Sequence, residues 1–139
     1  MPHTNAKPVC NLVPESSRYS EKVIRSVEFD GMDLVIEFQG EGFSYGRLTF
    51  PTVEGFRVLD ERNLVEFWDE YHEGNGWLWE VESGGWLDLE RQRRGFLDHE
   101  FLPQMREYLV VDDRCVSVFT MHLPVIEDFG TEPLRQSAA

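Results

Sequence analysis

Asp30-Gly31, placed between two β-rich runs, is the strongest structural signal in this chain. The runs cover residues 22–29 and 32–38, and an Asp-Gly pair between such runs favours a tight hairpin turn. In the second run apolar and polar residues alternate, as in a strand with one buried face. The sequence therefore predicts an antiparallel hairpin over residues 22–38.

Further strands follow from similar patterns. A third strand is expected over residues 43–50, because Pro51 cannot donate to a sheet ladder and ends it. Residues 77–82 and 86–90 flank a Ser-Gly-Gly turn and predict a second hairpin. Residues 107–111 and 115–119 flank Asp112-Asp113-Arg114 and predict a third hairpin.

One segment has helical periodicity. Four large apolar residues recur at positions i, i+3, i+4 and i+7: Leu64, Phe67, Trp68 and Tyr71. Asp60 is a suitable N-cap and Gly74 a suitable end, so residues 61–72 are predicted to form an amphipathic helix. Residues 96–106 have room for a short second helix, interrupted by Pro103.

These elements predict an α+β fold. It has a mostly antiparallel sheet of about six to seven strands built from hairpins, one main amphipathic helix and room for a short second one. A chain of 139 residues has the size of one domain, so residues 1–139 are assigned to a single domain. We expect residues 1–20 and 131–139 to be irregular or frayed, and the chain after Pro124 to be irregular.

Charge and composition exclude several classes of protein. The chain has 26 acidic against 13 basic residues, a formal net charge of −13, which repels nucleic acid phosphates and anionic lipid. With 41% hydrophobic residues it has too much apolar content for a disordered chain. No apolar stretch has the length of a signal peptide core or a membrane span. The two cysteines, Cys10 and Cys115, are interpreted as structural thiols in a reducing compartment, and we expect a cytoplasmic protein.

Motifs for catalysis or cofactor binding are not found in the sequence. The four histidines stand alone, without the paired spacing of a metal site. No nucleophile elbow or phosphate-binding loop occurs. A carboxylate pair such as Glu80 and Glu90 resembles a glycosidase pair, but 26 acids generate such pairs by chance. We therefore expect no enzyme activity, no metal and no cofactor.

The acidic excess is concentrated in residues 54–90, which contain eleven acids and two arginines. Aromatic residues are interleaved with these acids, a combination typical of interaction hot spots for basic partners. The simpler interpretations are a solvated surface for the acids and burial in the core for each single tryptophan. The predicted partner-binding residues are Glu66, Asp69, Glu70, Glu73, Trp77, Trp79, Glu80 and Glu82.

Short motifs in residues 54–126 add a family resemblance. They are an acidic aromatic segment, Gly76-Trp77, Gly84-Gly85-Trp86 with a following acid, and residues 107–111 and 115–118. In these features the chain resembles the small acidic cytosolic immunity proteins of bacterial polymorphic toxin systems. The resemblance implies a protein that binds a cognate toxin domain and covers its basic active site or substrate cleft.

Two other functions fit the same residues. One is a small enzyme or ligand-binding domain whose tryptophans line a pocket, and the other is an adaptor that binds a basic peptide. None of these interpretations involves direct binding to nucleic acid or to a membrane, and the oligomeric state stays open.

Overall fold

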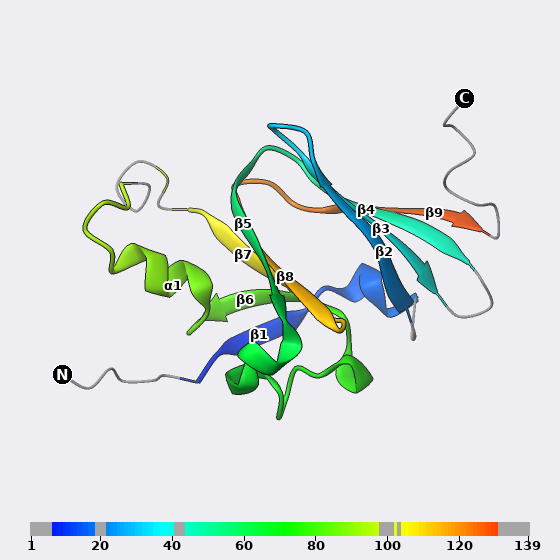
Figure 1. Ribbon diagram of the computed structural model, residues 1–139, viewed down its shortest axis with the longest axis horizontal. Helices are drawn as coiled ribbons and strands as arrows, with labels where there is room; N and C mark the ends of the chain where they lie inside the picture. The colour runs from blue at the N-terminus through cyan, green and yellow to red at the C-terminus, as the bar shows by residue number, and fades with distance from the viewer. Residues whose placement is uncertain (1–6, 19–21, 41–43, 98–101, 103, 131–139) are drawn as a thin grey trace.

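The computed structural model describes residues 7–18, 22–40, 44–97, 102 and 104–130, and these form nine strands in two antiparallel sheets (Figure 1). The five-stranded sheet has the order β1-β6-β7-β8-β5, with strands β1 (Val9–Leu12), β6 (Leu78–Ser83), β7 (Arg106–Val110), β8 (Arg114–Thr120) and β5 (Val53–Asp60). The four-stranded sheet has the order β2-β3-β4-β9, with strands β2 (Lys22–Phe29), β3 (Leu34–Gly40), β4 (Tyr45–Phe50) and β9 (Val125–Gly130).

The predicted α+β fold with a main amphipathic helix is wrong. The fold is mostly β, and the longest helix in the described ranges is α1 (Trp86–Arg91), with six residues. The other helical segments are 3₁₀ helices of three to five residues: η1 (Pro14–Arg18), η3 (Glu61–Asn63), η4 (Val65–Phe67) and η5 (Glu73–Asn75). No helix in the described ranges has the length and apolar character needed to cross a membrane.

The first and third predicted hairpins are confirmed. β2 pairs with β3 and β7 pairs with β8, both antiparallel. At the first turn Gly31 has a φ of 99°, and the Asp30 carboxylate accepts hydrogen bonds from the backbone N–H groups of Met32 and Asp33. The predicted third strand is also present as β4, which pairs with β3.

Three strands were not predicted. β1 and β9 lie in segments that were expected to be irregular, and β5 lies in a segment to which no element was assigned. Their partners are distant in the sequence, since β1 pairs with β6, β9 with β4 and β5 with β8. The local pattern is weak in β9, where most side chains stay exposed, so tertiary pairing decides its conformation.

The second predicted hairpin is wrong, because its second arm folds as α1. Gly84 turns the chain with a φ of 78°, and its N–H donates a 2.7 Å hydrogen bond to the Asp88 carboxylate. The Glu107 carboxylate on β7 then accepts the N–H groups of Trp86 and Leu87 at 3.0 and 2.9 Å. These bonds satisfy the first backbone donors of a helix.

The predicted helix over residues 61–72 is replaced by the short turns η3 and η4, separated at Leu64 (φ −131°, ψ 44°). Three acids of the predicted helix and a fourth directly after it would be neighbours at i+3 and i+4, and like charges at those spacings destabilise a helix. They are Glu66, Asp69, Glu70 and Glu73. Part of the predicted 96–106 helix lies outside the described residues, and the described residues 96, 97, 102, 104 and 105 are not helical.

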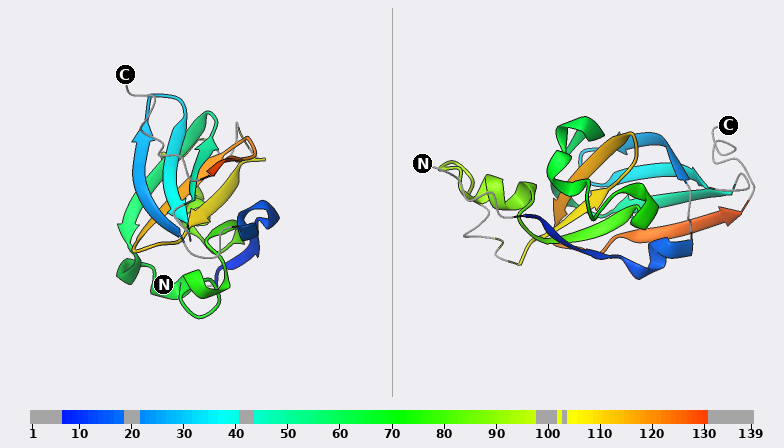
Figure 2. Two further views of the ribbon diagram at one scale, coloured as in Figure 1. Left: turned by 90° about the vertical axis from the view of Figure 1, so that its right-hand side faces the viewer. Right: turned by 90° about the horizontal axis from the view of Figure 1, so that it is seen from below.

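Both faces of the five-stranded sheet are covered (Figure 2). The main core lies between the sheets and includes Phe38 of β3, Phe50 of β4 and Tyr108 of β7. On the outer face, a second cluster lies beneath residues 61–75 and a third lies beside α1. Successive side chains of β7 pack on opposite faces of the sheet: Tyr108 lies in the main core and Leu109 in the second cluster.

Candidate functional site

Residues 61–75, which we call the acidic segment, cross the outer face of the five-stranded sheet and carry five acids against one arginine. Leu64 and Phe67 anchor the segment, with 2% and 5% of their surfaces exposed. Val65 and Trp68 stay 58% and 45% exposed. In a 3₁₀ turn residues i and i+3 share a direction, so Leu64 and Phe67 point inward together while Val65 and Trp68 point outward together.

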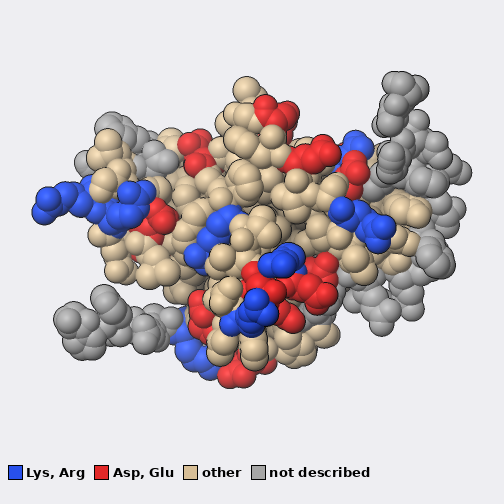
Figure 3. All heavy atoms as spheres, in the orientation of Figure 1, with Lys and Arg blue, Asp and Glu red and all other residues tan. Residues whose placement is uncertain are grey.

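The structure brings part of the predicted site together on this segment. Glu66, Asp69 and Glu70 are all exposed there, close in sequence to the exposed Trp68. In the view of Figure 3, acidic and basic side chains are interleaved over the lower part of the molecule, where the segment lies in Figure 1. Glu73 belongs to η5, and its side chain lies outside the described part of the structure.

The two predicted tryptophans are packed inside the protein. Trp77 is 2% exposed, and its indole N–H donates a 2.8 Å hydrogen bond to the carbonyl of Ser16. Trp79 is 7% exposed and donates to the carbonyl of Gly76 at 3.3 Å. Their rings therefore contribute to folding, and Trp68 is the indole that the acidic segment presents to solvent.

Glu80 and Glu82 point to the other face of the five-stranded sheet. Successive side chains of a strand alternate, and Trp79 and Val81 of β6 pack into the cluster beneath the acidic segment. Glu80 instead lies 3.6 Å from the guanidinium of Arg106, and Glu82 accepts a 3.1 Å hydrogen bond from the Asn11 amide. These two carboxylates are thus separated from the acidic segment.

A pocket of about 320 Å³ opens between the acidic segment and the sheet. Its floor is apolar, with Leu109, Val111 and Cys115 from β7, β8 and their connection. Its walls and rim come from the acidic segment: Glu61, Leu64, Phe67, Trp68, Tyr71 and His72. We call it the apolar pocket.

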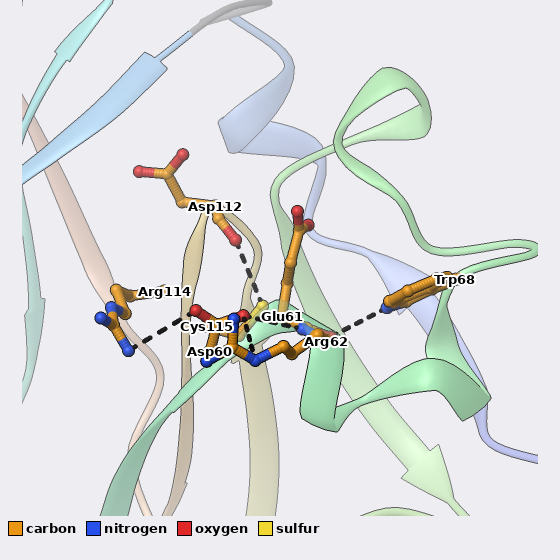
Figure 4. Close-up of polar contacts among 7 residues, drawn as sticks. All are labelled: Asp60, Glu61, Arg62, Trp68, Asp112, Arg114 and Cys115. Carbon is orange, nitrogen blue, oxygen red and sulfur yellow. Dashed lines mark hydrogen bonds and ion pairs between the residues drawn. The ribbon is translucent and has the colours of Figure 1, made fainter.

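A hydrogen-bond network fixes the rim of the apolar pocket (Figure 4). The backbone N–H of Glu61 donates to the carbonyl of Asp113, and the indole N–H of Trp68 donates to the carbonyl of Glu61 at 2.9 Å. Cys115 at the floor donates its thiol to the carbonyl of Asp112 at 3.4 Å. Rim and floor are therefore both held by the turn between β7 and β8.

Two arginines, Arg62 and Arg114, form ion pairs with Asp60. Arg62 and Arg114 lie 3.8 and 3.7 Å from the two oxygens of the Asp60 carboxylate. The Glu61 carboxylate forms no ion pair with any residue that the structure describes. Glu61 lines the apolar pocket, and Figure 4 shows its side chain extending away from Asp60 and Arg114.

Sequence reasoning did not identify Glu61, Val65 and Trp68 as surface residues of the site. Trp68 was assigned to the apolar face of the predicted helix, because i+4 spacing places it beside Leu64 there. The observed 3₁₀ geometry turns it outward. A possible signal was the run of like charges, which argues against a continuous helix.

Other polar groups do not form a metal centre in the described residues. No three or more His, Cys, Asp or Glu side chains in the described ranges are arranged to hold a metal ion. Burial raises the pKa of Cys10 to about 12, which keeps its thiol protonated and unreactive. A second pocket of about 310 Å³, next to Glu80 and Tyr108, lies on the other side of the five-stranded sheet, and neither pocket is lined by Trp77 or Trp79.

Comparison with known proteins gives no match to this chain among protein-family models, curated proteins or solved structures. The functional interpretation therefore depends on the geometry of the acidic segment and the apolar pocket.

Proposed function

We propose that this chain is an immunity protein that binds a cognate toxin domain and covers its basic active-site or substrate cleft with the acidic segment. The observation that carries this proposal is the exposure of Trp68 and Val65 among Glu66, Asp69 and Glu70. A large aromatic ring surrounded by carboxylates combines the contact area and the charge that a cationic cleft requires.

Three physical features support the binding of a partner by this surface. The segment rests on buried Leu64 and Phe67, so its exposed side chains are displayed from a packed base. Its carboxylates are exposed to solvent in the free protein, so they carry no large desolvation cost there. They can then pair with arginine and lysine of a partner. A net charge of −13 also steers a basic partner toward the molecule.

The test uses the protein encoded beside this chain's gene as the toxin candidate. Reversal of Glu66, Asp69 and Glu70 to lysine should lower the association rate constant at least about tenfold at low salt, because steering depends on local charge. Stopped-flow fluorescence measures the rate, and growth of cells that express the toxin measures protection.

A matched control separates local from total charge. Glu28, Glu54 and Glu127 are exposed on β2, β5 and β9, and their reversal to lysine changes the net charge by the same amount. We expect this variant to keep most of its association rate and its protection. Equal effects of the two triple variants, or full binding by the first, would contradict the assignment of the surface.

A further inference from the structure

We infer that the apolar pocket receives the side chain of an arginine from the toxin partner, with its guanidinium at the Glu61 carboxylate. This inference rests on the proposed function and specifies the chemistry by which the partner is recognised. It is carried by the shape of the pocket, the charge at its rim and the aromatic ring beside that charge.

The size of the pocket fits a single side chain. Its volume of about 320 Å³ is at the lower end of the roughly 300–1,000 Å³ range of ligand cavities. The floor of Leu109 and Val111 and the walls of Leu64 and Phe67 offer apolar surface to the methylene groups of a long side chain. Arginine and lysine both bury such stems while their charged ends stay at a polar rim.

The charge at the rim selects a cation. Asp60 already lies beside Arg62 and Arg114, whereas the adjacent Glu61 has no ion-pair partner in the described part of the chain. Glu66, Asp69 and Glu70 add negative potential from the same segment. An incoming cation therefore gains a carboxylate at the pocket and does not have to displace a bound arginine from it.

The aromatic wall favours arginine over lysine. Trp68 and Glu61 line the same pocket and are tied together by the hydrogen bond from the indole N–H to the Glu61 carbonyl. A planar guanidinium can stack on an aromatic ring and donate two parallel hydrogen bonds to a carboxylate, and an ammonium group cannot do both. Arginine and tryptophan are also enriched among interface hot spots.

The first experiment titrates the ¹⁵N-labelled chain with N-acetyl-arginine amide and follows amide and indole resonances. We expect shifts at the Trp68 indole N–H and at the backbone N–H groups of Leu109 and Val111. The substitution Glu61→Gln should weaken binding roughly threefold to fivefold, the size of an exposed ion pair. Glu54→Gln, an exposed glutamate on β5, is the control and should leave binding unchanged.

Two further probes test the chemistry. N-acetyl-lysine amide should bind more weakly than the arginine probe, and N-acetyl-norleucine amide should bind weakest because it lacks the charge. Equal binding of the norleucine probe would show an apolar anchor site and overturn the inference. Shifts of the arginine probe that map away from the pocket would overturn it as well.

The complex with the toxin separates this inference from the proposed function. A double-mutant cycle should couple Glu61→Gln to the replacement of one cleft arginine of the toxin by alanine. If the triple lysine variant loses toxin binding but no cleft arginine couples to Glu61, the proposed function stands and the inference fails. If the arginine probe binds the pocket as expected but the triple variant still binds the toxin, the proposed surface fails instead.

Discussion

Glu107 is a carboxylate buried at the start of α1. It is 3% exposed, and burial raises its pKa to about 7 despite the two backbone N–H groups of α1 that it accepts. The charge of Arg57 partly offsets this rise, but Arg57 is itself partly buried, so burial lowers its pKa, and its guanidinium lies 5.0 Å from the centre of the Trp86 ring. Glu107 thus holds the start of α1 against the sheet at a cost in desolvation.

This environment predicts a pH-dependent stability. Between about pH 4.5 and pH 7 the folded chain keeps the Glu107 proton that the unfolded chain has lost, so the unfolding free energy falls as pH rises. The substitution Glu107→Gln removes this dependence. We therefore expect the difference in unfolding free energy between the natural protein and the variant to change by about 3 kcal/mol between about pH 4.5 and pH 7. Urea denaturation at a series of pH values measures it.

Glu54→Gln provides the comparison, since Glu54 is exposed on β5 and its substitution should leave the pH profile parallel to that of the natural protein. A Glu107→Gln profile that is also parallel would show that Glu107 ionises at its ordinary pKa.

At the scale of elements, the acidic segment divides its aromatic residues between the core and the surface. Phe67 is buried against the sheet, whereas Trp68 makes its hydrogen bond to the Glu61 carbonyl at the surface. This division follows from the 3₁₀ turns, because a continuous α-helix would have placed both rings on one face. Stability and partner binding should therefore respond to different residues of one short segment.

We expect Phe67→Ala to lower the unfolding free energy by about 3–5 kcal/mol, as for a large core residue. Trp68→Ala should cost only about 1 kcal/mol, the size of one net hydrogen bond, and should weaken toxin binding. Thermal and urea denaturation measure the first effect, and calorimetric titration with the toxin measures the second. Similar stability losses in the two variants would indicate that both rings are buried, against this structure.

At the scale of the whole molecule, one hydrophobic core joins the two sheets. Residues from β3 and β4 pack directly against residues from β6, β7 and β8. The carboxylate of Asp112, in the turn after β7, also accepts a 2.8 Å hydrogen bond from the backbone N–H of Ile24 on β2. These contacts predict that the two sheets unfold together as one domain.

Leu48 on β4 is fully buried and tests this expectation. The substitution Leu48→Ala should lower the unfolding free energy by about 2–5 kcal/mol. Because Trp79 lies on β6 of the other sheet and Trp77 comes directly before that strand, tryptophan fluorescence should follow the same shifted urea transition as far-ultraviolet circular dichroism. Two separate transitions would mean that the sheets are independent units.

Local sequence predicted the elements whose conformation depends on neighbouring residues. The hairpin at Asp30-Gly31 and the hairpin of β7 and β8 follow from turn chemistry and alternation, which act over a few residues. The acids of the candidate surface could also be predicted, because charged side chains are rarely buried unpaired. Glu66, Asp69 and Glu70 are exposed together for that reason.

Tertiary structure alone decided the remaining features. α1 is capped by Glu107, about twenty residues further along the chain, and β9 is a strand because it pairs with β4. The sheet likewise decides which rings are buried, since the turns of the acidic segment direct Leu64 and Phe67 inward and leave Trp68 outside. For α1 and β9 the deciding hydrogen bonds come from residues far apart in the chain, so no local pattern contains them.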